Sequence, residues 1–379
     1  MASDCGSSKT RLKVAIVAPS LRYVGGQAVQ ADLLMRLWQG DSDVEVSFLG
    51  VDPVVPRMLA WAERVPGFRT LLREPIYFLD LWRGLRDVDI AHIFSASYWS
   101  FLLAPAPAWF FAKVRGRKAL INYRSGEARD HLQRFRSGPF ILSRADAIVV
   151  PSGYLVDVLR EFGLKAAVVP NLVDLSQFRY RERNPLRPHL VCTRGFSAYY
   201  SVDVVVRAFA EVKRVYPDAR LDLVGSGPLE TNVRKLVADL KLSNVNFSGV
   251  ASRQDIGACY DQADIFINAS WLDNMPVSII EAFRAGTPVV TTSPESIPYL
   301  VENERTGLLS AVGDEKALAA NVIRLLRDPA LALRLAQNAH QESGKYTWNA
   351  VREQWLQVYR GLMGAAQPDQ GTKAVVLQR

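Results

Sequence analysis

The stretch IFINASWLDNMPVSIIEAFRAGTPVV, residues 265–290, decides the fold predicted for this chain. It begins with a short apolar strand over 265–267 and continues as a polar loop over 268–274. A helix is predicted to begin at Pro276 and to end at Gly286, because Pro is favoured at the first position of a helix and Gly just past its end. A second apolar strand follows. This order of elements is typical of a parallel sheet covered by helices.

The start of this helix is the predicted binding site for a phosphate or diphosphate. The first backbone N–H groups of a helix have no partner within the helix, and they lie at the positive end of the helix dipole. The N–H groups expected to face the anion belong to Met275, Val277 and Ser278, with Asn274 and Pro276 beside them.

Two acidic residues flank the same helix start. Glu281 lies roughly 7.5 Å beyond Pro276 along the axis, at about 1.5 Å per residue, and this is close to the reach from a diphosphate to the hydroxyls of its ribose. A buried carboxylate needs a partner, and a ribose diol offers two donors. Asp273 precedes the helix and would lie on the other side of the phosphates. The alternative is an ordinary helix start with an acidic cap and a solvated Glu281.

The pair Asp273 and Glu281, with seven residues between them, resembles the acidic pair of the retaining nucleotide-sugar glycosyltransferases of family 4. The resemblance implies the GT-B fold, an α/β architecture of two Rossmann-like parallel-sheet domains facing across a cleft. It also implies that the first acid contacts the donor sugar and the second the nucleotide ribose. Family members usually have Glu at the first position, so Asp273 is one methylene shorter than the pattern.

A glycine loop in the first half is assigned to the same site. Gly25 and Gly26 follow the apolar strand over 12–18, and glycine lets a ligand approach the backbone. Taken alone, such a loop is equally well a plain turn. The resemblance implies that it faces the donor diphosphate and the acceptor.

Residues of the second half complete the donor site implied by the resemblance. Arg194 matches the arginine that neutralises the donor phosphates, whereas the accompanying lysine is missing and residues 199–201 (YYS) occupy its neighbourhood. The turn with Gly225 and Gly227 is similar to one near the nucleotide, and Val250 lies where backbone groups face the base.

Three residues are predicted to be catalytic: Asp273, Arg194 and Arg124. Arg124 stands where family members often have a histidine that contacts the sugar near its reacting carbon, and His131 lies seven residues further on. Either side chain could approach the site, and the alternative for a lone histidine is a structural role. No metal and no other cofactor are expected, because Arg194 and the helix start would take the charge of the leaving group.

The predicted domains are an acceptor-side domain over 1–183, a nucleotide-sugar domain over 184–345, a helix over 346–363 that crosses back to the first domain, and a flexible tail over 364–379. The boundary rests on the charged, Pro-containing stretch 179–189.

The net charge of +8 is concentrated in the first half of the chain. Residues 1–183 hold 25 Lys and Arg against 18 Asp and Glu, which gives +7. No nucleic-acid-binding motif accompanies this charge, so no nucleic acid is expected as a partner. An anionic or lipid-linked acceptor, or contact with an anionic membrane, fits better. Over 52–88, arginines alternate with aromatic and leucine residues, which suits either a surface at headgroup level or an ordinary helical insertion with solvated arginines.

One segment is long enough to span a bilayer. Ile93–Ala112 has twenty uncharged residues, but its prolines and serines favour a buried strand followed by a core helix. Residues 1–11 lack the apolar run of a signal peptide, and the three cysteines are scattered. A cytoplasmic location is therefore predicted, with peripheral contact to the inner face of the membrane.

The predicted function is transfer of a sugar from a UDP- or GDP-linked donor to an acceptor, with retention of configuration, in polysaccharide or glycolipid assembly at the inner membrane surface. The alternatives are a nucleotide-sugar epimerase of the same fold and a non-catalytic membrane-surface partner that has kept the fold.

Overall fold

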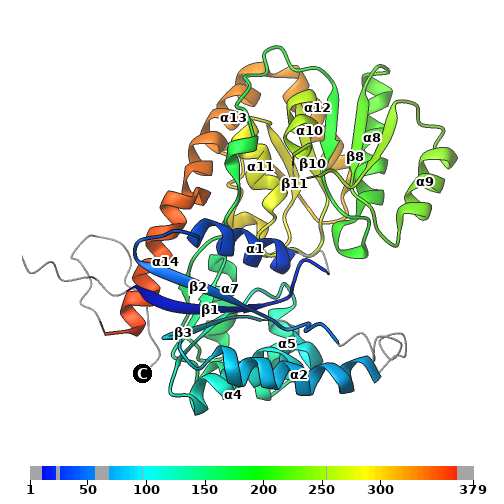
Figure 1. Cartoon of the computed structure of the whole chain (residues 1–379). Helices are drawn as coiled ribbons and strands as arrows, with labels where there is room; N and C mark the ends of the chain where they lie inside the picture. Colours follow the sequence, from blue (N-terminus) through cyan, green and yellow to red (C-terminus); the bar gives the residue numbers. More distant parts are fainter. Residues whose placement is uncertain (1–10, 23–25, 56–67, 96, 253, 365–379) are drawn as a thin grey trace, which may run out of the picture. The chain divides into compact units, whose positions relative to one another are not determined.

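The computed structural model describes residues 11–22, 26–55, 68–95, 97–252 and 254–364. The chain divides into two compact units, one made of Met1–Leu172 with Arg352–Arg379 and the other of Val173–Val351. Each unit contains a six-stranded parallel sheet flanked by helices (Figure 1). The prediction of an α/β fold with two parallel-sheet domains is confirmed.

The sheet of the first unit is built from short apolar runs. Its inner strands are buried on both faces, as expected for parallel strands covered by helices. The strand order is β2-β1-β3-β4-β5-β6. The strands are β1 (Leu12–Ala18), β2 (Val44–Gly50), β3 (Ile90–Phe94), β4 (Lys118–Asn122), β5 (Ala147–Val150) and β6 (Ala167–Val168).

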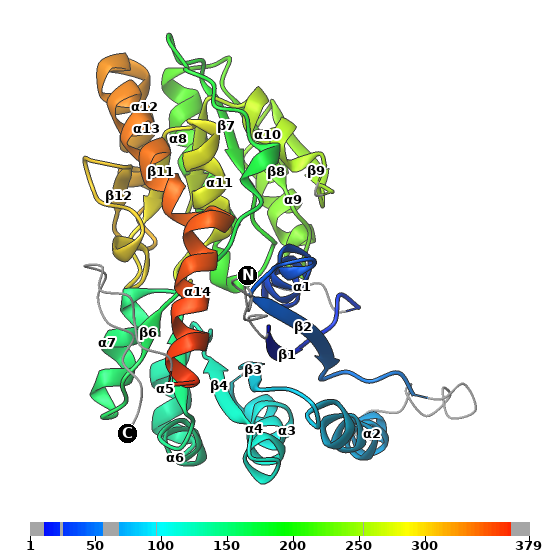
Figure 2. The same cartoon turned by 60° about the vertical axis from the view of Figure 1, so that its left-hand side comes forward.

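Helices cover both faces of this sheet, with α1 on one face and α2 and α4 on the other (Figures 1 and 2). The inner sides of α2 and α4 join one apolar cluster with β1, β3 and β4. The helices are α1 (Gly26–Trp38), α2 (Phe68–Gly84), α3 (Tyr98–Leu103), α4 (Pro105–Val114), α5 (Ala128–Arg134), α6 (Ser137–Leu142) and α7 (Gly153–Glu161).

The uncharged segment 93–112 forms the end of β3 and then α3 and α4, as the strand-and-helix interpretation predicts. Among the residues that the structure describes, every helix is too short or too polar to cross a bilayer. Part of the arginine- and aromatic-rich segment, 56–67, lies outside the described residues, and most of the remainder forms α2.

The last helix, α14 (Trp348–Leu362), belongs to the first unit from Arg352 onward. Arg352 Nε donates to Asp41 Oδ2 at 2.7 Å, and Tyr359 Oη lies 2.8 Å from His92 Nδ1 in the core. A C-terminal helix that returns to the first domain is thus present, while the predicted tail over 364–379 lies outside the described residues from 365 onward.

The second unit repeats the architecture with strand order β12-β11-β10-β7-β8-β9. Its strands are β7 (His189–Cys192), β8 (Arg220–Val224), β9 (Val245–Gly249), β10 (Ile265–Asn268), β11 (Val289–Thr292) and β12 (Leu308–Ser310). Its helices are α8 (Val202–Val215), α9 (Glu230–Asp239), α10 (Ile256–Gln262), α11 (Val277–Ala285), α12 (Glu315–Arg327) and α13 (Pro329–Ser343). Separate apolar clusters fill the two faces of the sheet.

The division between the units lies eleven residues earlier than the predicted boundary after residue 183. Val173 already belongs to the core of the second unit. Arg183 is buried there, and its guanidinium donates to the carbonyl oxygens of Tyr260, Ala263 and Ala285 at 2.7–2.8 Å. The charged composition of this stretch indicated a linker, but Arg181, Arg183 and Arg187 are hydrogen-bonded inside the second unit.

Candidate functional site

The predicted strand and helix of the stretch 265–290 are present as β10 and α11. The helix begins at Val277, one residue later than predicted, because Pro276 has an extended ψ of 114° and acts as the N-cap. Gly286 ends the helix with φ +69°, as predicted. A Cβ on Gly286 would lie 2.6 Å from a ring carbon of Tyr180, so both the backbone angle and the close packing require glycine.

The start of α11 has the geometry expected of an anion site. The N–H of Ile279 bonds to the carbonyl of Pro276 at 3.2 Å. Val277 and Ser278 precede Ile279, so their N–H groups have no acceptor within the helix. The preceding loop is fixed by Asp273, whose Oδ1 accepts from the N–H of Asn274 at 2.8 Å. This places a carboxylate beside the helix start.

Arg194 reaches the same point from the loop after β7. Its guanidinium is buried, binds the carboxylate of Asp273 and donates to Ser278 Oγ at 3.1 Å. The ring of Tyr200 lies 3.8 Å from the guanidinium carbon. Burial alone would lower the pKa of Arg194, but the neighbouring Asp273 and Tyr200 outweigh burial and raise this pKa. Tyr200, which lies in the stretch 199–201 where the expected lysine is missing, therefore packs against the arginine.

Glu281 lies one turn further along α11 and has a partner, Tyr260, that its position in the sequence did not indicate. The hydroxyl of Tyr260, on α10, lies 2.8 Å from Glu281 Oε2, 2.9 Å from the carbonyl oxygen of Ser278 and 2.6 Å from Thr193 Oγ1. Burial raises the pKa of Glu281 to about 7, although Tyr260 and Arg194 act in the opposite direction. A buried tyrosine usually finds a polar partner for its hydroxyl, but its sequence position does not say which one.

The hydrogen bonds of this cluster accommodate Glu281 in either protonation state, and its pKa of about 7 places the change near neutral pH. The Tyr260 hydroxyl has one proton and three oxygen partners, the Ser278 carbonyl, Glu281 and Thr193 Oγ1, the last of which can also donate. When Glu281 is protonated it can donate to the Tyr260 oxygen, while Tyr260 donates to Ser278. Ionisation of Glu281 removes that donor, and the Thr193 hydroxyl can then donate to the Tyr260 oxygen while Tyr260 donates to Glu281 or to the Ser278 carbonyl.

The two glycines of the turn after β8 are explained by backbone packing. A Cβ on Gly225 would lie 2.3 Å from the carbonyl oxygen of Arg194, and a Cβ on Gly227 would lie 2.6 Å from that of Phe196. The turn therefore supports the loop that carries Arg194. Val250 is exposed just after β9, at the carboxyl edge of the same sheet.

The remaining predicted residues belong to the first unit. Gly25 lies outside the described residues. Gly26 is the exposed first residue of α1, and a Cβ there would meet no described atom within 4 Å. Arg124 donates to the side-chain oxygens of Asn122, at 3.3 Å, and Asn171, and burial lowers its pKa to about 10.

His131 is a core residue, in contrast to the suggestion that it could approach the site. Its ring is fully buried, and its Nδ1 lies 2.7 Å from the hydroxyl of Tyr123. Burial lowers the pKa of His131 to about 4, so the ring is neutral at physiological pH.

Of the predicted site residues, the structure brings together Arg194, Asp273 and Glu281, with Ser278 beside them, within the second unit.

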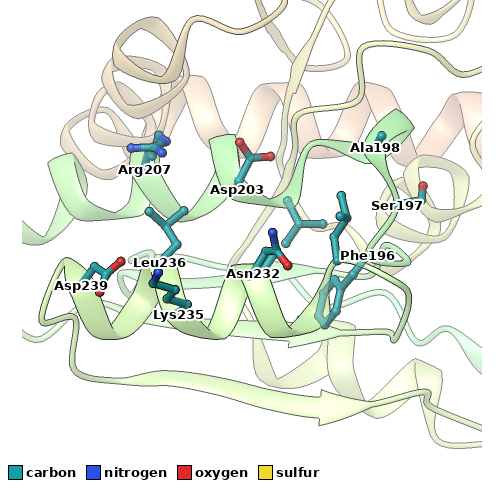
Figure 3. A pocket seen from close by; sticks show the side chains of 12 residues that line it. Phe196, Ser197, Ala198, Asp203, Arg207, Asn232, Lys235, Leu236 and Asp239 are labelled. Atoms are coloured by element: carbon teal, nitrogen blue, oxygen red, sulfur yellow. The ribbon is translucent and has the colours of Figure 1, made fainter.

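A pocket of about 520 Å³ lies between α8, α9 and the loop 196–198 (Figure 3). Its rim carries two acidic residues, Asp203 and Asp239, and two basic residues, Arg207 and Lys235. None of the predicted site residues lines it, and its balanced charges favour neither an anionic nor a cationic ligand.

Known protein families match the two halves of the chain. The family described as Glycosyltransferase Family 4 matches residues 24–177, and the one described as Glycosyl transferases group 1 matches residues 178–342. The chain belongs to the glycosyltransferases.

This glycosyltransferase is 24% identical over 307 residues to the lipopolysaccharide core biosynthesis glycosyltransferase LpsE of Rhizobium meliloti, a match that covers 79% of this chain and 86% of the relative. A sucrose-phosphate synthase from Thermosynechococcus elongatus shares the fold with a TM-score of 0.78 and 21% identity, over 94% of this chain and 100% of its own. HepE of Anabaena, solved in complex with UDP and glucose, gives a TM-score of 0.71 at 15% identity, over 92% and 99% of the two chains.

These matches confirm the predicted glycosyltransferase and its GT-B fold. They do not favour the epimerase or the non-catalytic partner that the sequence left as alternatives.

Proposed function

We propose that this glycosyltransferase transfers a sugar from a UDP- or GDP-linked donor to an acceptor with retention of configuration. The observation that carries the proposal is the buried pair of Arg194 and Asp273 at the start of α11, with Glu281 one turn further on. HepE, a structural neighbour, was solved with UDP and glucose, which supports a nucleotide donor of this kind.

The diphosphate of the donor would bind between Arg194 and the N–H groups of Val277 and Ser278. A diphosphate carries more charge than a carboxylate, so it would replace Asp273 as the main partner of the guanidinium. Asp273 would then be free to accept hydrogen bonds from the sugar. The charge that develops on the leaving nucleoside diphosphate would be stabilised by the same donors, without a metal ion or other cofactor.

The other predicted residues take supporting roles in this proposal. Glu281 would accept hydrogen bonds from the ribose diol, and exposed backbone at Val250 would face the base. From the first unit, Gly25 and Gly26 would let the diphosphate and the acceptor approach, and Arg124 would lie near the reacting carbon. The acceptor hydroxyl would replace the diphosphate on the same face of the sugar, which retains its configuration.

The acceptor is proposed to be anionic or lipid-linked, in polysaccharide or glycolipid assembly at the inner face of a membrane. The supporting observations are the charge of +7 over residues 1–183 and the relative LpsE, whose name places it in lipopolysaccharide core biosynthesis. A positive surface attracts an anionic acceptor and orients its approach.

The proposal is tested by titration calorimetry of the protein with UDP and with GDP, each with magnesium and with EDTA. One nucleotide should bind, equally well under both conditions. Glu281→Ala should weaken binding by about 1–3 kcal/mol, the loss expected for a charged hydrogen bond. Glu315→Ala, at the start of α12 in the same unit, is the matched control. Binding of neither nucleotide, or an equal effect of the two variants, would contradict the proposed site.

The stereochemistry has a separate test. The donor that raises the melting temperature most is supplied with candidate acceptors, and the anomeric configuration of the product is read by NMR. An inverted product would leave the donor site intact but remove retention from the proposal.

A further inference from the structure

The outer surface of α2 and α4 exposes large apolar side chains. Phe78 and Trp82 on α2 are 38% and 44% exposed, and Phe110 and Val114 on α4 are 55% and 54% exposed. In each helix the pair is spaced by four residues, so both members lie on one side of the helix. A contiguous exposed apolar surface marks a site of interaction in a soluble domain.

Three of these side chains, Phe78, Trp82 and Phe110, meet at the ring of Phe111. Its centroid lies 5.7 Å from that of Phe78, 6.3 Å from that of Trp82 and 5.6 Å from that of Phe110. All four rings lie within the range of favourable aromatic contacts. The two helices therefore present a single aromatic surface.

The fold itself does not need this outer surface. The inner side of α2 packs Tyr77 and Leu81, and the inner side of α4 packs Ala108 and Ala112, into the cluster against the sheet. Each helix is thus apolar on two sides. Its inner side packs into the core, and its outer side faces away from the core.

Arginines surround the exposed rings. The guanidinium of Arg115 lies 3.5 Å from the ring centroid of Trp82 and donates to the carbonyl of Trp82 at 2.6 Å. Arg83 and Arg86 are exposed at the end of α2. Residues 81–118 contain six basic and two acidic residues, a net charge of +4.

We propose that this α2–α4 face, made of Phe78, Trp82, Phe110 and Val114 with Arg83, Arg86 and Arg115, rests on a bilayer that contains anionic lipids. Aromatic rings are favoured at the depth of the headgroups, and arginines beside them bind lipid phosphates. The inference rests on the membrane location in the proposed function and names the surface that would provide it. No residue of the donor site lies in this face, so vesicle flotation and nucleotide binding test the two proposals separately.

Charge decides between a bilayer and a second copy of the chain as the occupant. A symmetric dimer would bring the same surface of two copies together, so the arginines of one copy would face those of the other. An anionic bilayer instead supplies the opposite charge along the whole rim.

A neighbouring helix repeats the same arrangement. The guanidinium of Arg144, just after the end of α6, lies 3.7 Å from the ring centroid of the exposed Phe140 on that helix. In Figure 2, α2, α4 and α6 lie along the same lower edge of the first unit. The face can therefore contact the bilayer at more than one point.

Flotation of the full chain with phosphatidylcholine vesicles, with and without phosphatidylglycerol, tests the inference. The wild-type protein should float with the anionic vesicles and remain behind with the neutral ones. Trp82→Ser combined with Phe110→Ser should weaken binding by about tenfold or more. Arg83→Gln combined with Arg86→Gln should weaken it by about fivefold for each arginine, and added salt should do the same.

Tyr299→Ser is the matched control, because Tyr299 is an aromatic residue 52% exposed on the second unit. It should bind vesicles like the wild type, and all variants should keep the wild-type melting temperature and nucleotide binding. Three results would overturn the inference: no binding to anionic vesicles, equal loss in the control, or a wild-type dimer in solution that the double aromatic variant turns into a monomer.

Discussion

In the proposed donor complex, Arg194 would exchange its anionic partner from Asp273 to the diphosphate. In the structure it holds Asp273 and Ser278 against the start of α11. An arginine that is buried and already paired costs little to reorganise, because the guanidinium keeps its position while the anion changes. Asp273 is one methylene shorter than the Glu that is usual in the family. It suits this exchange of partners because it reaches Arg194 from a loop and not from the helix.

The pKa of Glu281 predicts the pH dependence of donor binding. Burial raises this pKa to about 7, so the protein without donor binds a proton there below pH 7. A ribose diol prefers the carboxylate, and by linkage the affinity for a nucleotide sugar should rise as the pH increases from 6 to 8 and then level off. Calorimetry at several pH values measures this. Glu281→Gln should bind weakly and with a flat profile, and a flat profile in the wild type would disprove the prediction.

Tyr260 is predicted to position Glu281. Its hydrogen bond to Glu281 lowers the pKa of that residue, so Tyr260→Phe should move the midpoint of the binding profile to higher pH. It should also cost about 1 kcal/mol of stability, because the Ser278 carbonyl and Thr193 lose a partner. Tyr346→Phe, at another buried tyrosine of the second unit, is the control that keeps the midpoint. A loss of stability with no change in midpoint would mean a purely structural role.

At the scale of elements, the loop after β7 and the turn after β8 act as one support. The N–H of Phe196 bonds to the carbonyl of Ser226 at 3.0 Å, and the N–H of Leu229 bonds to the carbonyl of Phe196 at 2.9 Å. Backbone contact this close explains why the turn contains glycines. The position of Arg194 is thereby set by a neighbouring strand and its turn.

Gly225→Ala is predicted to disturb this support. The new Cβ would lie 2.3 Å from the carbonyl oxygen of Arg194 at a φ of +150°, so the two loops must separate. The expected loss of stability in urea unfolding is about 2–4 kcal/mol, with weaker nucleotide binding. Gly313→Ala is the control, because Gly313 also has a positive φ, +79°, but open space around it. It should cost only about 1 kcal/mol. Equal losses in the two variants would remove the packing argument.

At the scale of the whole molecule, the chain enters the second unit at Val173 and returns to the first in α14. The returning helix is fixed by charge as well as by apolar contact. Arg352 pairs with Asp41 and Asp43 on one side of the first unit. Burial acts to raise the pKa of Asp41, and the hydrogen bond from Arg352 acts to lower it. The net result is that the pKa of Asp41 is below its usual value.

Arg352→Ala should therefore destabilise the first unit by about 1–3 kcal/mol, because the partly buried Asp41 loses its arginine partner and Asp43 keeps only Arg360. The difference from the wild type should shrink as the pH falls through the lowered pKa of Asp41, since a protonated carboxyl no longer needs the arginine. Urea unfolding at pH 7 and at low pH measures this. Arg327→Ala is the control, because Arg327 is exposed at the end of α12, and it should leave the stability unchanged. A similar loss of stability in this variant would contradict the prediction.

The sequence by itself determined the apolar strands, the helix of the stretch 265–290 and the family, because these depend on local periodicity and on spacing along the chain. Only the tertiary structure decided which side chains meet. Arg194 and Asp273 are 79 residues apart, and Tyr260 and Glu281 are 21 apart on different helices. The same holds for the buried charges before residue 184 and for the aromatic face of α2 and α4. Composition shows that a charge or a ring is present, but its partner is set by how distant elements pack.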